Sequence, residues 1–390
     1  MNILVDLRAL MGGKISGVEI YILNLLENLL KIDQENTYLF FMNSFKKQQL
    51  YFDRFQADNG IFVQTRIPNK ILNFCLSFLR RPRLDRLVLN SLKKRVLFKE
   101  TVPSKIDLFF MPNMNVSALS KGVKKVVTIH DLAFEHFPQF FSFKTKLWYK
   151  LIRPRREIKQ SDMIIAVSQS TADDLRSTYR VPFSKIKVIY EGVDEHLGAD
   201  IGVEQLNQCK QKYNLPDQYF LCLSTLEPRK NLSRLIEAFL LFKKNNPERL
   251  IKLVLAGKEQ QHIFSRLHLA YPDNVILTGF IEEKDKAAVM SGATAFLYPS
   301  LFEGFGLPLV EAMKIGVPII TSRTSSMPEI VGDAALLIDP YDVNDMAIAL
   351  EKIVQPELKA DLLRKMKSRI KFFSWQTCAE ATLRIFEQFH

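Results

Sequence analysis

The stretch TAFLYPSLFEGFGLPLVEAM, residues 294–313, contains the three local signals on which the fold depends. Residues 294–300 are a short apolar run of the kind found in strands buried on both faces of a parallel sheet. A glycine-containing turn follows. Pro308 then suits the first turn of a helix, because its missing N–H would be unpaired there in any case. We therefore expect a strand, a loop and a helix that runs to Gly316.

The same alternation of short apolar runs and longer helical patterns extends outward in both directions. Strand-like runs lie at 2–6, 38–42, 106–111, 125–130 and 163–168 in the first half, and at 219–224, 252–257, 274–279, 294–300 and 317–322 in the second. A helical pattern lies between two of them at 231–245. Strands that alternate with helices predict β-α-β units and parallel sheets.

The strand series begins twice, near residue 2 and near residue 219, which predicts two Rossmann-like domains in an α/β chain. The polar segment between them is predicted to be a linker. We expect the following division: a first domain at 1–195, a linker at 196–215, a second domain at 216–373 and a C-terminal helix at 374–390. Ligands of such sheets bind beyond the carboxyl ends of the strands, so the two sheets should face a cleft.

Composition and charge limit the class of protein. Hydrophobic residues make up 47% of the chain, and no apolar run is long enough to span a bilayer, so we expect a soluble, cytoplasmic protein. Four widely spaced cysteines predict reduced thiols. The net charge of +12 lies almost wholly in residues 1–200, which contain 31 Lys and Arg against 20 Asp and Glu. This excess favours an anionic partner for the first half.

The loop and helix after residue 300 form a candidate anion site. The backbone N–H groups of Phe305, Gly306 and Leu307 would point out of a helix N-terminus, which carries positive character. Glu303 lies beside this position, and Glu311 lies within the helix. Because carboxylates repel phosphates, we expect both acids to bind hydroxyl groups, so the ligand would carry anions and vicinal hydroxyls, as a nucleotide sugar does. The alternative is a structural loop with two solvated glutamates.

Three other stretches place candidate side chains after strands. Arg229 and Lys230 precede the helical pattern at 231–245, where two adjacent cations can neutralise a diphosphate. His130 ends a strand-like run and could hydrogen-bond a sugar or transfer a proton. Gly13 belongs to a glycine turn that lacks the spacing of a dinucleotide motif. The plainer interpretations are a surface charge pair, a structural histidine and an ordinary turn.

Taken together, these stretches resemble the retaining glycosyltransferases of family four, the group 1 glycosyltransferases of the GT-B fold. The residues that carry the resemblance are EGFGLPLVEAM at 303–313, LEPRKN at 226–231, IHD at 129–131, AVSQST at 166–171, EGVD at 191–194 and PEIVGDAALLIDP at 328–340. The resemblance covers nearly the whole chain and is stronger in the second half.

The resemblance implies that the second domain binds a nucleotide sugar. It assigns Glu311 to the ribose hydroxyls, Glu303 to sugar hydroxyls near the reacting carbon, and the Arg-Lys pair of LEPRKN to the departing diphosphate. The N–H groups of the glycine loop would position sugar and phosphate. His130 would contact the sugar and its developing cation, and Gly13 would approach the diphosphate. The C-terminal helix would cross back to the first domain, and neither a metal nor another cofactor is expected.

The implied reaction moves a hexose, with mannose from GDP-mannose preferred over a UDP-sugar, to a glycan or lipid-linked acceptor with retention of configuration. It would serve the synthesis of surface polysaccharide or glycolipid. The rival enzyme is a nucleotide-sugar epimerase or a phosphorylase on the same fold, although no setting for a pyridoxal phosphate lysine is visible. The rival outside enzymes is a basic nucleic-acid-binding protein, which would have no need of Glu303; we expect no nucleic acid partner.

Two basic segments of the first half predict contact with a membrane. Residues 70–100 contain nine Lys and Arg against two acids, with apolar residues between them. Residues 144–156 repeat this composition with Trp148 and Tyr149. Such a pattern is typical of a helix that lies on anionic lipid, here at the cytoplasmic face of the inner membrane. The alternative is a helix that packs its apolar face on its own domain.

Overall fold

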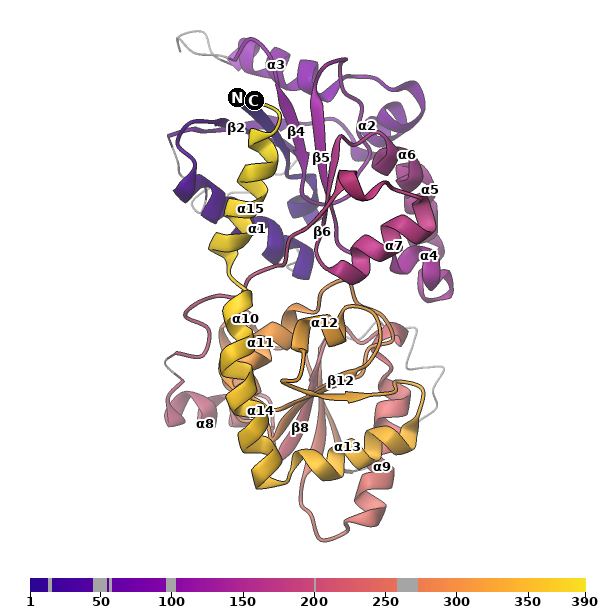
Figure 1. Ribbon diagram of the computed structural model, residues 1–390, viewed down its shortest axis with the longest axis vertical. Coiled ribbons are helices and arrows are strands. Elements are labelled where there is room, and N and C mark those ends of the chain that lie inside the picture. The colour runs from indigo at the N-terminus through magenta and orange to yellow at the C-terminus, as the bar shows by residue number, and fades with distance from the viewer. Residues whose placement is uncertain (13–15, 45–54, 56–57, 96–102, 200, 258–272) are drawn as a thin grey trace. The chain divides into compact units, whose positions relative to one another are not determined.

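The computed structural model describes residues 1–12, 16–44, 55, 58–95, 103–199, 201–257 and 273–390. These residues form two units (Figure 1). Unit 1 consists of Met1–Glu191 together with Trp375–His390, and unit 2 consists of Gly192–Ser374. Each unit contains one parallel sheet with helices around it, which confirms the predicted α/β class.

In the described part of unit 1 the sheet has seven parallel strands, in the order β3-β2-β1-β4-β5-β6-β7. They span Asn2–Asp6 (β1), Thr37–Asn43 (β2), Gly60–Thr65 (β3), Leu108–Met111 (β4), Lys124–Ile129 (β5), Met163–Ala166 (β6) and Ile186–Val188 (β7). The α-helices are Gly17–Ile32 (α1), Asn69–Phe74 (α2), Leu84–Arg95 (α3), Ala133–His136 (α4), Phe143–Ile152 (α5), Pro154–Lys159 (α6), Gln169–Tyr179 (α7) and Trp375–Glu387 (α15). A π-helical turn, η3, continues α2 at Cys75–Leu79.

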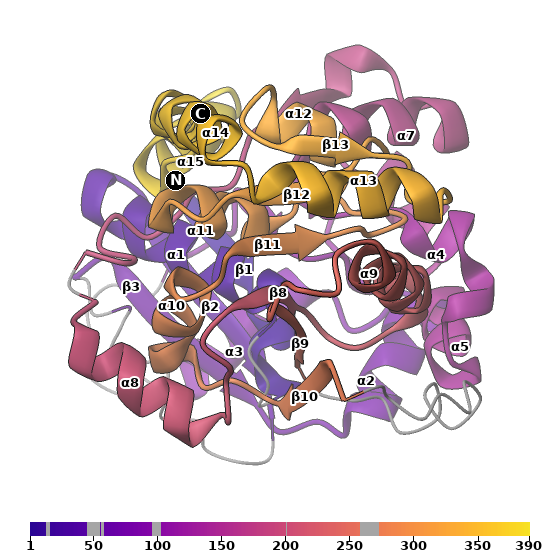
Figure 2. The same ribbon diagram turned by 90° about the horizontal axis from the view of Figure 1, so that it is seen from below.

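In the described part of unit 2 the sheet has six parallel strands, in the order β10-β9-β8-β11-β12-β13. They span Tyr219–Leu223 (β8), Lys252–Ala256 (β9), Val275–Gly279 (β10), Ala295–Tyr298 (β11), Ile319–Ser322 (β12) and Leu336–Ile338 (β13). The α-helices are Val203–Lys212 (α8), Leu232–Asn245 (α9), Glu283–Ser291 (α10), Leu307–Ile315 (α11), Met327–Val331 (α12), Val343–Ile353 (α13) and Pro356–Arg369 (α14). Both views show α9 beside α13 (Figures 1 and 2).

The strands of unit 1 direct alternate side chains toward two helix layers, as the period of a strand requires. Leu4, Phe109 and Val127 belong to a buried core that also contains residues of α2, η3, α3 and α7. Phe110, which follows Phe109 in β4, instead packs against Phe386 of α15 with ring centroids 5.1 Å apart. The C-terminal helix predicted at 374–390 is thus α15, and it packs on α1 within unit 1.

The ten predicted strands are all confirmed, with ends that differ by at most two residues. The prediction missed β3, β7 and β13, whose sequences are GIFVQT, IKV and LLI. All three are edge strands, and each has residues that are exposed or half-buried. An edge strand needs no continuous apolar run, because only part of its surface is covered.

The segment predicted as a linker, 196–215, contains α8, which belongs to unit 2 and packs on α10. An isolated parallel bridge joins Val193 to Ser374 and so holds the two ends of unit 2 side by side. Among the described helices, none has both the length and the apolar content that a bilayer crossing requires. All four cysteines are free thiols.

One glycine allows two strand ends of unit 2 to approach closely. Gly257 follows β9 with a φ of +146°, and its N–H donates to the carbonyl oxygen of Gly279 at 2.7 Å. A Cβ atom at this position would lie 1.7 Å from the carbonyl oxygen of Ser224. Only glycine, which has no Cβ atom, fits against the end of β8 at this point.

Candidate active site

The loop after β11 leads directly into α11, as predicted. Gly306 has a φ of +102°, in the left-handed region that favours glycine, and Leu307 is the first residue of the helix. Pro308 occupies the first turn, and the helix ends at Ile315. The side chains of Phe305 and Leu307 are both buried. The loop therefore presents backbone groups of the helix start rather than apolar side chains.

Glu303 lies in this loop and is held by both cations of LEPRKN. Arg229 Nη1 donates to Glu303 Oε2 at 2.9 Å, and Lys230 Nζ donates to Glu303 Oε1 at 2.6 Å. Glu303 is 6% exposed and Lys230 is 7% exposed. Three residues that we expected at the site therefore form one buried ion cluster, with a direct contact between acid and cations that the sequence did not predict.

Neighbouring groups fix the orientation of both cations. Arg229 also donates to Glu227 through Nε at 3.1 Å and Nη2 at 2.8 Å, and to the carbonyl oxygen of Phe302 at 2.9 Å. Lys230 donates to the Tyr298 hydroxyl at 2.9 Å, and its ammonium group lies 4.8 Å from the centroid of that ring. These contacts hold both positive charges at the carboxyl edge of the sheet before any ligand arrives, which is the preorganisation that stabilisation of a leaving anion requires.

The cluster keeps Glu303 ionised. Burial raises the pKa of Glu303, but the charges of Arg229 and Lys230 outweigh burial and bring that pKa to about 2. Burial and the nearby Glu303 raise the pKa of Tyr298 well above its ordinary value, so this hydroxyl remains protonated. At neutral pH the site therefore contains a carboxylate between two cations and a neutral tyrosine.

Glu311 forms a separate buried pair. Lys286, on α10, donates to Glu311 Oε1 at 2.6 Å and to Glu283 Oε1 at 2.6 Å. Burial lowers the pKa of Lys286, but the charges of Glu311 and Glu283 raise it above its ordinary value overall. Each of the two motif glutamates thus has its own cationic partner. This pairing reduces the repulsion that these acids would otherwise exert on a bound phosphate.

His130 lies in unit 1, directly after β5, with 16% of its side chain exposed. Its Nε2 atom lies 3.0 Å from the carbonyl oxygen of Pro112, and its Nδ1 atom lies 3.4 Å from Glu191 Oε1. The ring of Tyr21 packs edge-on against the imidazole with centroids 4.8 Å apart. Burial lowers the pKa of His130, but Glu191 and the Pro112 carbonyl raise it overall. Because both ring nitrogens face acceptors, the protonated ring is favoured.

Replacement of Glu191 by glutamine is expected to lower the pKa of His130, because the replacement removes the carboxylate beside Nδ1. A histidine whose pKa is raised on folding adds stability below its unfolded pKa and loses it as the pH rises through the folded value. Glu191→Gln should therefore cost about 1 kcal/mol below pH ~6 and less at pH ~8. NMR titration of the ring and urea unfolding at both pH values measure this; equal losses at both would contradict it.

Gly13, the last candidate from the sequence, lies outside the described residues.

The structure also brings two further residues to the candidate site. Lys286 and Glu191, which contact predicted site residues, were not predicted to take part. Lys286 lies in an ordinary charged helix, so no local signal marks it, whereas Glu191 begins the EGVD stretch that contributed to the family resemblance. Only contacts between distant parts of the chain identify either residue.

Two family models match the chain. Residues 15–197 match the model described as Glycosyltransferase Family 4, and residues 205–371 match the model described as Glycosyl transferases group 1. The two matches together extend over nearly the whole chain, one in each half. They confirm the resemblance inferred from the motifs, and they do not favour the epimerase and nucleic-acid-binding alternatives.

Curated relatives include mannosyltransferases. The serotype-specific mannosyltransferase WbdA of Escherichia coli is 34% identical over 242 residues, which are 59% of this chain but 29% of that protein. The O-antigen chain mannosyltransferase B of Escherichia coli is 28% identical over 269 residues, which are 68% of this chain and 70% of that protein. The chain therefore spans less than a third of the length of WbdA.

A solved structure extends the comparison to the fold. The structure of Anabaena Alr3699/HepE in complex with UDP and glucose matches with a TM-score of 0.70 at 18% identity, and the match covers 100% of both chains. At this identity the likeness shows the fold alone. Two parallel-sheet units, the family matches in both halves and this structural likeness lead to one conclusion: the chain belongs to the group 1 glycosyltransferases and has the GT-B fold.

Proposed function

We propose that the chain transfers a hexosyl group from a nucleotide sugar to a hydroxyl group of a glycan or lipid-linked acceptor, with retention of configuration. The observation that carries the proposal is the buried cluster in which Glu303 holds Arg229 and Lys230 beside the start of α11. Fixed positive charge beside a helix N-terminus suits a leaving diphosphate. Family membership supports transfer rather than another use of the same fold.

The donor diphosphate would lie against Arg229, Lys230 and the backbone of Gly306 and Leu307. Lys230 uses two of its three N–H bonds in contacts with Glu303 and Tyr298, so the third is available for a phosphate oxygen. The Tyr298 hydroxyl, which accepts from Lys230, stays protonated and so adds no negative charge beside the diphosphate. Glu303 would take sugar hydroxyls with its remaining lone pairs while it holds the cations in place.

The nucleoside would extend toward Glu311. Because Lys286 neutralises this carboxylate, Glu311 can accept hydrogen bonds from both ribose hydroxyls without strong repulsion of the adjacent diphosphate. The contact of His130 with the sugar stays a prediction.

In the proposed step, the bond between the anomeric carbon and the diphosphate oxygen breaks, and the electron pair stays on the diphosphate. The acceptor hydroxyl forms the new bond from the same face. Its proton passes to the departing phosphate oxygen, so the products are the glycoside and the protonated nucleoside diphosphate. Arg229 and Lys230 would stabilise the charge that develops on the leaving group, the role that a metal ion has in other transferases.

We propose GDP-mannose as the donor. The support is the resemblance to mannosyltransferases in the sequence and the mannosyltransferase relatives from Escherichia coli. A UDP-sugar is the alternative, since the structurally similar HepE was solved with UDP and glucose. The names of the relatives also support an acceptor in the synthesis of a surface polysaccharide.

Thermal unfolding in the presence of GDP-mannose, UDP-glucose and the free nucleotides tests the donor. A donor at about a hundred times its Kd should add about 2.7 kcal/mol of stability. Stabilisation by GDP-mannose, together with release of GDP by slow hydrolysis of the donor with EDTA present, would support both the donor and metal-free cleavage of its bond to the sugar. Stabilisation by UDP-glucose alone would overturn the choice of donor, and a response to none of them would overturn the proposed function.

A further inference from the structure

The surface of unit 1 around α2 and η3 exposes large apolar side chains. The two elements bury Leu72 and Leu76 in the core. Outside that buried stripe, four side chains are 51–62% exposed, and we call them the apolar patch: Ile71, Phe74, Phe78 and Leu79. Phe74 and Phe78 contact each other with ring centroids 5.0 Å apart. Isolated exposed apolar residues are common, whereas four within nine positions indicate a contact surface.

The neighbouring helix α3 does not share this feature. Its apolar residues Leu84, Val88 and Leu92 are all buried in the core of unit 1. Of the segment predicted at 70–100 to contact a membrane, the α3 part therefore packs on its own domain, and only α2 and η3 leave an apolar face uncovered. Residues 96–100 lie outside the part of the chain that the structure describes.

Arginine side chains gather beside the apolar patch. The Arg153 guanidinium lies 4.6 Å from the centroid of the Phe78 ring. Arg156 Nη1 donates to a carbonyl oxygen of η3 at 2.8 Å, and burial and the charge of Arg156 both lower the pKa of Arg80. Arg80 and Arg153 each have a left-handed backbone, with φ values of 56° and 57°, where Gly or Asn is more usual. Three positive charges are thus held together next to exposed aromatic rings, and the buried carboxylate of Glu157 pairs with one of them, Arg156, at 3.2 Å.

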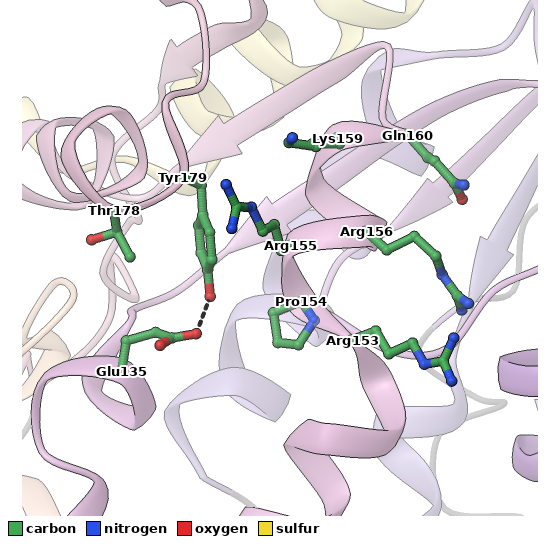
Figure 3. Close-up of a pocket in the computed structure, with 9 residues that line it drawn as sticks. All are labelled: Glu135, Arg153, Pro154, Arg155, Arg156, Lys159, Gln160, Thr178 and Tyr179. Carbon is green, nitrogen blue, oxygen red and sulfur yellow. Dashed lines mark hydrogen bonds between the residues drawn. The ribbon is translucent and has the colours of Figure 1, made fainter.

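Two of these arginines, Arg153 and Arg156, line an open pocket of about 670 Å³ (Figure 3). Figure 3 shows Arg153 and Arg156 on one side of α6, and Arg155 on the other side next to the ring of Tyr179. Lys159 adds a fourth cation to the lining, and Glu135 is its one carboxylate. Within the described residues, the Arg156 Nε atom is buried without a hydrogen-bond partner. The lining therefore carries an excess of positive charge that favours an anionic group.

The segment that carries the apolar patch contains few acids. Residues 66–95 contain nine Lys and Arg and one acid, Asp85. Asp85 is 5% exposed and accepts the N–H of Ser120, so it is not part of the outer surface. A partner for this surface must therefore be both anionic and able to take up apolar side chains.

We propose that this face of unit 1 binds the surface of an anionic lipid bilayer. The apolar patch enters the headgroup region, and the two arginines beside it, Arg80 and Arg153, bind lipid phosphates. Aromatic side chains beside long basic ones are typical of elements that lie in a membrane interface, where the apolar part is buried and the charged end stays with the headgroups. Nucleic acid would leave the apolar patch exposed to water. The inference does not depend on the donor or on the proposed reaction.

Flotation of the full chain with vesicles tests the proposal. At low salt the protein should float with vesicles that contain phosphatidylglycerol and remain behind with phosphatidylcholine alone. Arg80→Gln with Arg153→Gln should lower the partition coefficient about fivefold per arginine, and high salt should reduce binding of the original chain in the same direction. Phe74→Ser with Phe78→Ser should lower it at least about tenfold, since two aromatic rings leave the interface.

Phe183 and Arg176 provide a matched control in the same unit. Phe183 is 63% exposed, and the Arg176 guanidinium lies 5.7 Å from the centroid of its ring. Phe183→Ser with Arg176→Gln removes the same kinds of group at another place and should leave flotation unchanged. Thermal unfolding of every variant confirms that it is folded.

Three results would overturn the proposal. The first is no flotation of the original chain with anionic vesicles at low salt. The second is an equal loss of binding in the control variant. The third is self-association that Phe74→Ser with Phe78→Ser abolishes, in the absence of lipid binding, since the patch would then be an interface between copies of the chain.

Discussion

Replacement of Glu303 by alanine is expected to reduce kcat/KM for transfer about 10²- to 10³-fold, the usual effect of losing a fixed group that acts on a leaving anion. Arg229 and Lys230 both donate to this carboxylate, and without it each loses one of the contacts that fix its position. The same change leaves two positive charges in a buried place without their shared partner. It should therefore lower the free energy of unfolding by about 3–5 kcal/mol.

The dependence of stability on pH tests the contribution of the Glu303 charge, because glutamine has nearly the same shape but no charge. A carboxylate with a folded pKa of about 2 and an unfolded pKa of 4.5 contributes stability above pH 4.5 that is lost as the pH falls through 2. The contribution is about 3 kcal/mol from the size of that shift. The original chain should therefore lose more stability between pH ~5 and pH ~2 than Glu303→Gln does. Urea unfolding across this range measures the difference.

Glu227→Gln serves as the control for the first prediction, because the Glu227 carboxylate pairs with Arg229 but is less buried than that of Glu303. It should reduce transfer less than Glu303→Ala does. Transfer that Glu303→Ala leaves unchanged would contradict the role of Glu303 at the leaving group, and a loss of stability in that case would restrict Glu303 to a structural role.

Replacement of Gly257 by alanine is expected to cost more than about 4 kcal/mol and to prevent unit 2 from folding. The new Cβ would lie 1.7 Å from the carbonyl oxygen of Ser224 and 2.8 Å from its carbonyl carbon. Both atoms are backbone, so no side chain can rotate away to make room. The left-handed φ of +146° adds strain for any residue with a Cβ.

Gly279→Ala is the matched control for this prediction. Gly279 is the last residue of β10 and has a φ of +73°, but no atom lies within 4 Å of an added Cβ. It should cost only about 1–2 kcal/mol, the strain of a left-handed backbone. Urea unfolding and the soluble yield of each variant measure the effects. Similar values for the two variants would show that the strand ends separate easily and that the contact with Ser224 does not matter.

Buried strands could be predicted from the sequence because a parallel sheet covered on both faces requires continuous apolar runs. Runs such as 219–224 and 252–257 therefore marked β8 and β9 directly. The edge strand β13 has no such requirement, and its Leu337 is 38% exposed. The start of α11 could also be predicted, because Gly306 and Pro308 satisfy local constraints that do not depend on the rest of the chain.

The pairing of charges within the site could not be predicted. Glu303 and Lys230 are 73 positions apart, and nothing in either stretch indicates that they touch. We expected both glutamates to bind only hydroxyl groups, because a carboxylate without a cationic partner repels phosphate. The sequence did not show that each carboxylate has such a partner. The segment at 70–100, which we predicted to contact a membrane, also could not be interpreted fully from the sequence. The spacing of apolar residues in a helix is the same whether they face the core or a membrane. Only the fold shows that the apolar residues of α3 are buried and that several of those of α2 are exposed.

Unit 1 is built from two separate pieces of chain, and this has a consequence for its synthesis. The ribosome completes residues 1–191 long before it reaches Trp375, yet Phe110 of the sheet is covered by Phe386 of α15. While residues 192–374 are being translated, the apolar surface around Phe110 therefore stays uncovered. Unit 2 can therefore complete its folding before unit 1 does. A chaperone that binds exposed apolar surface would bind the nascent chain within residues 1–191.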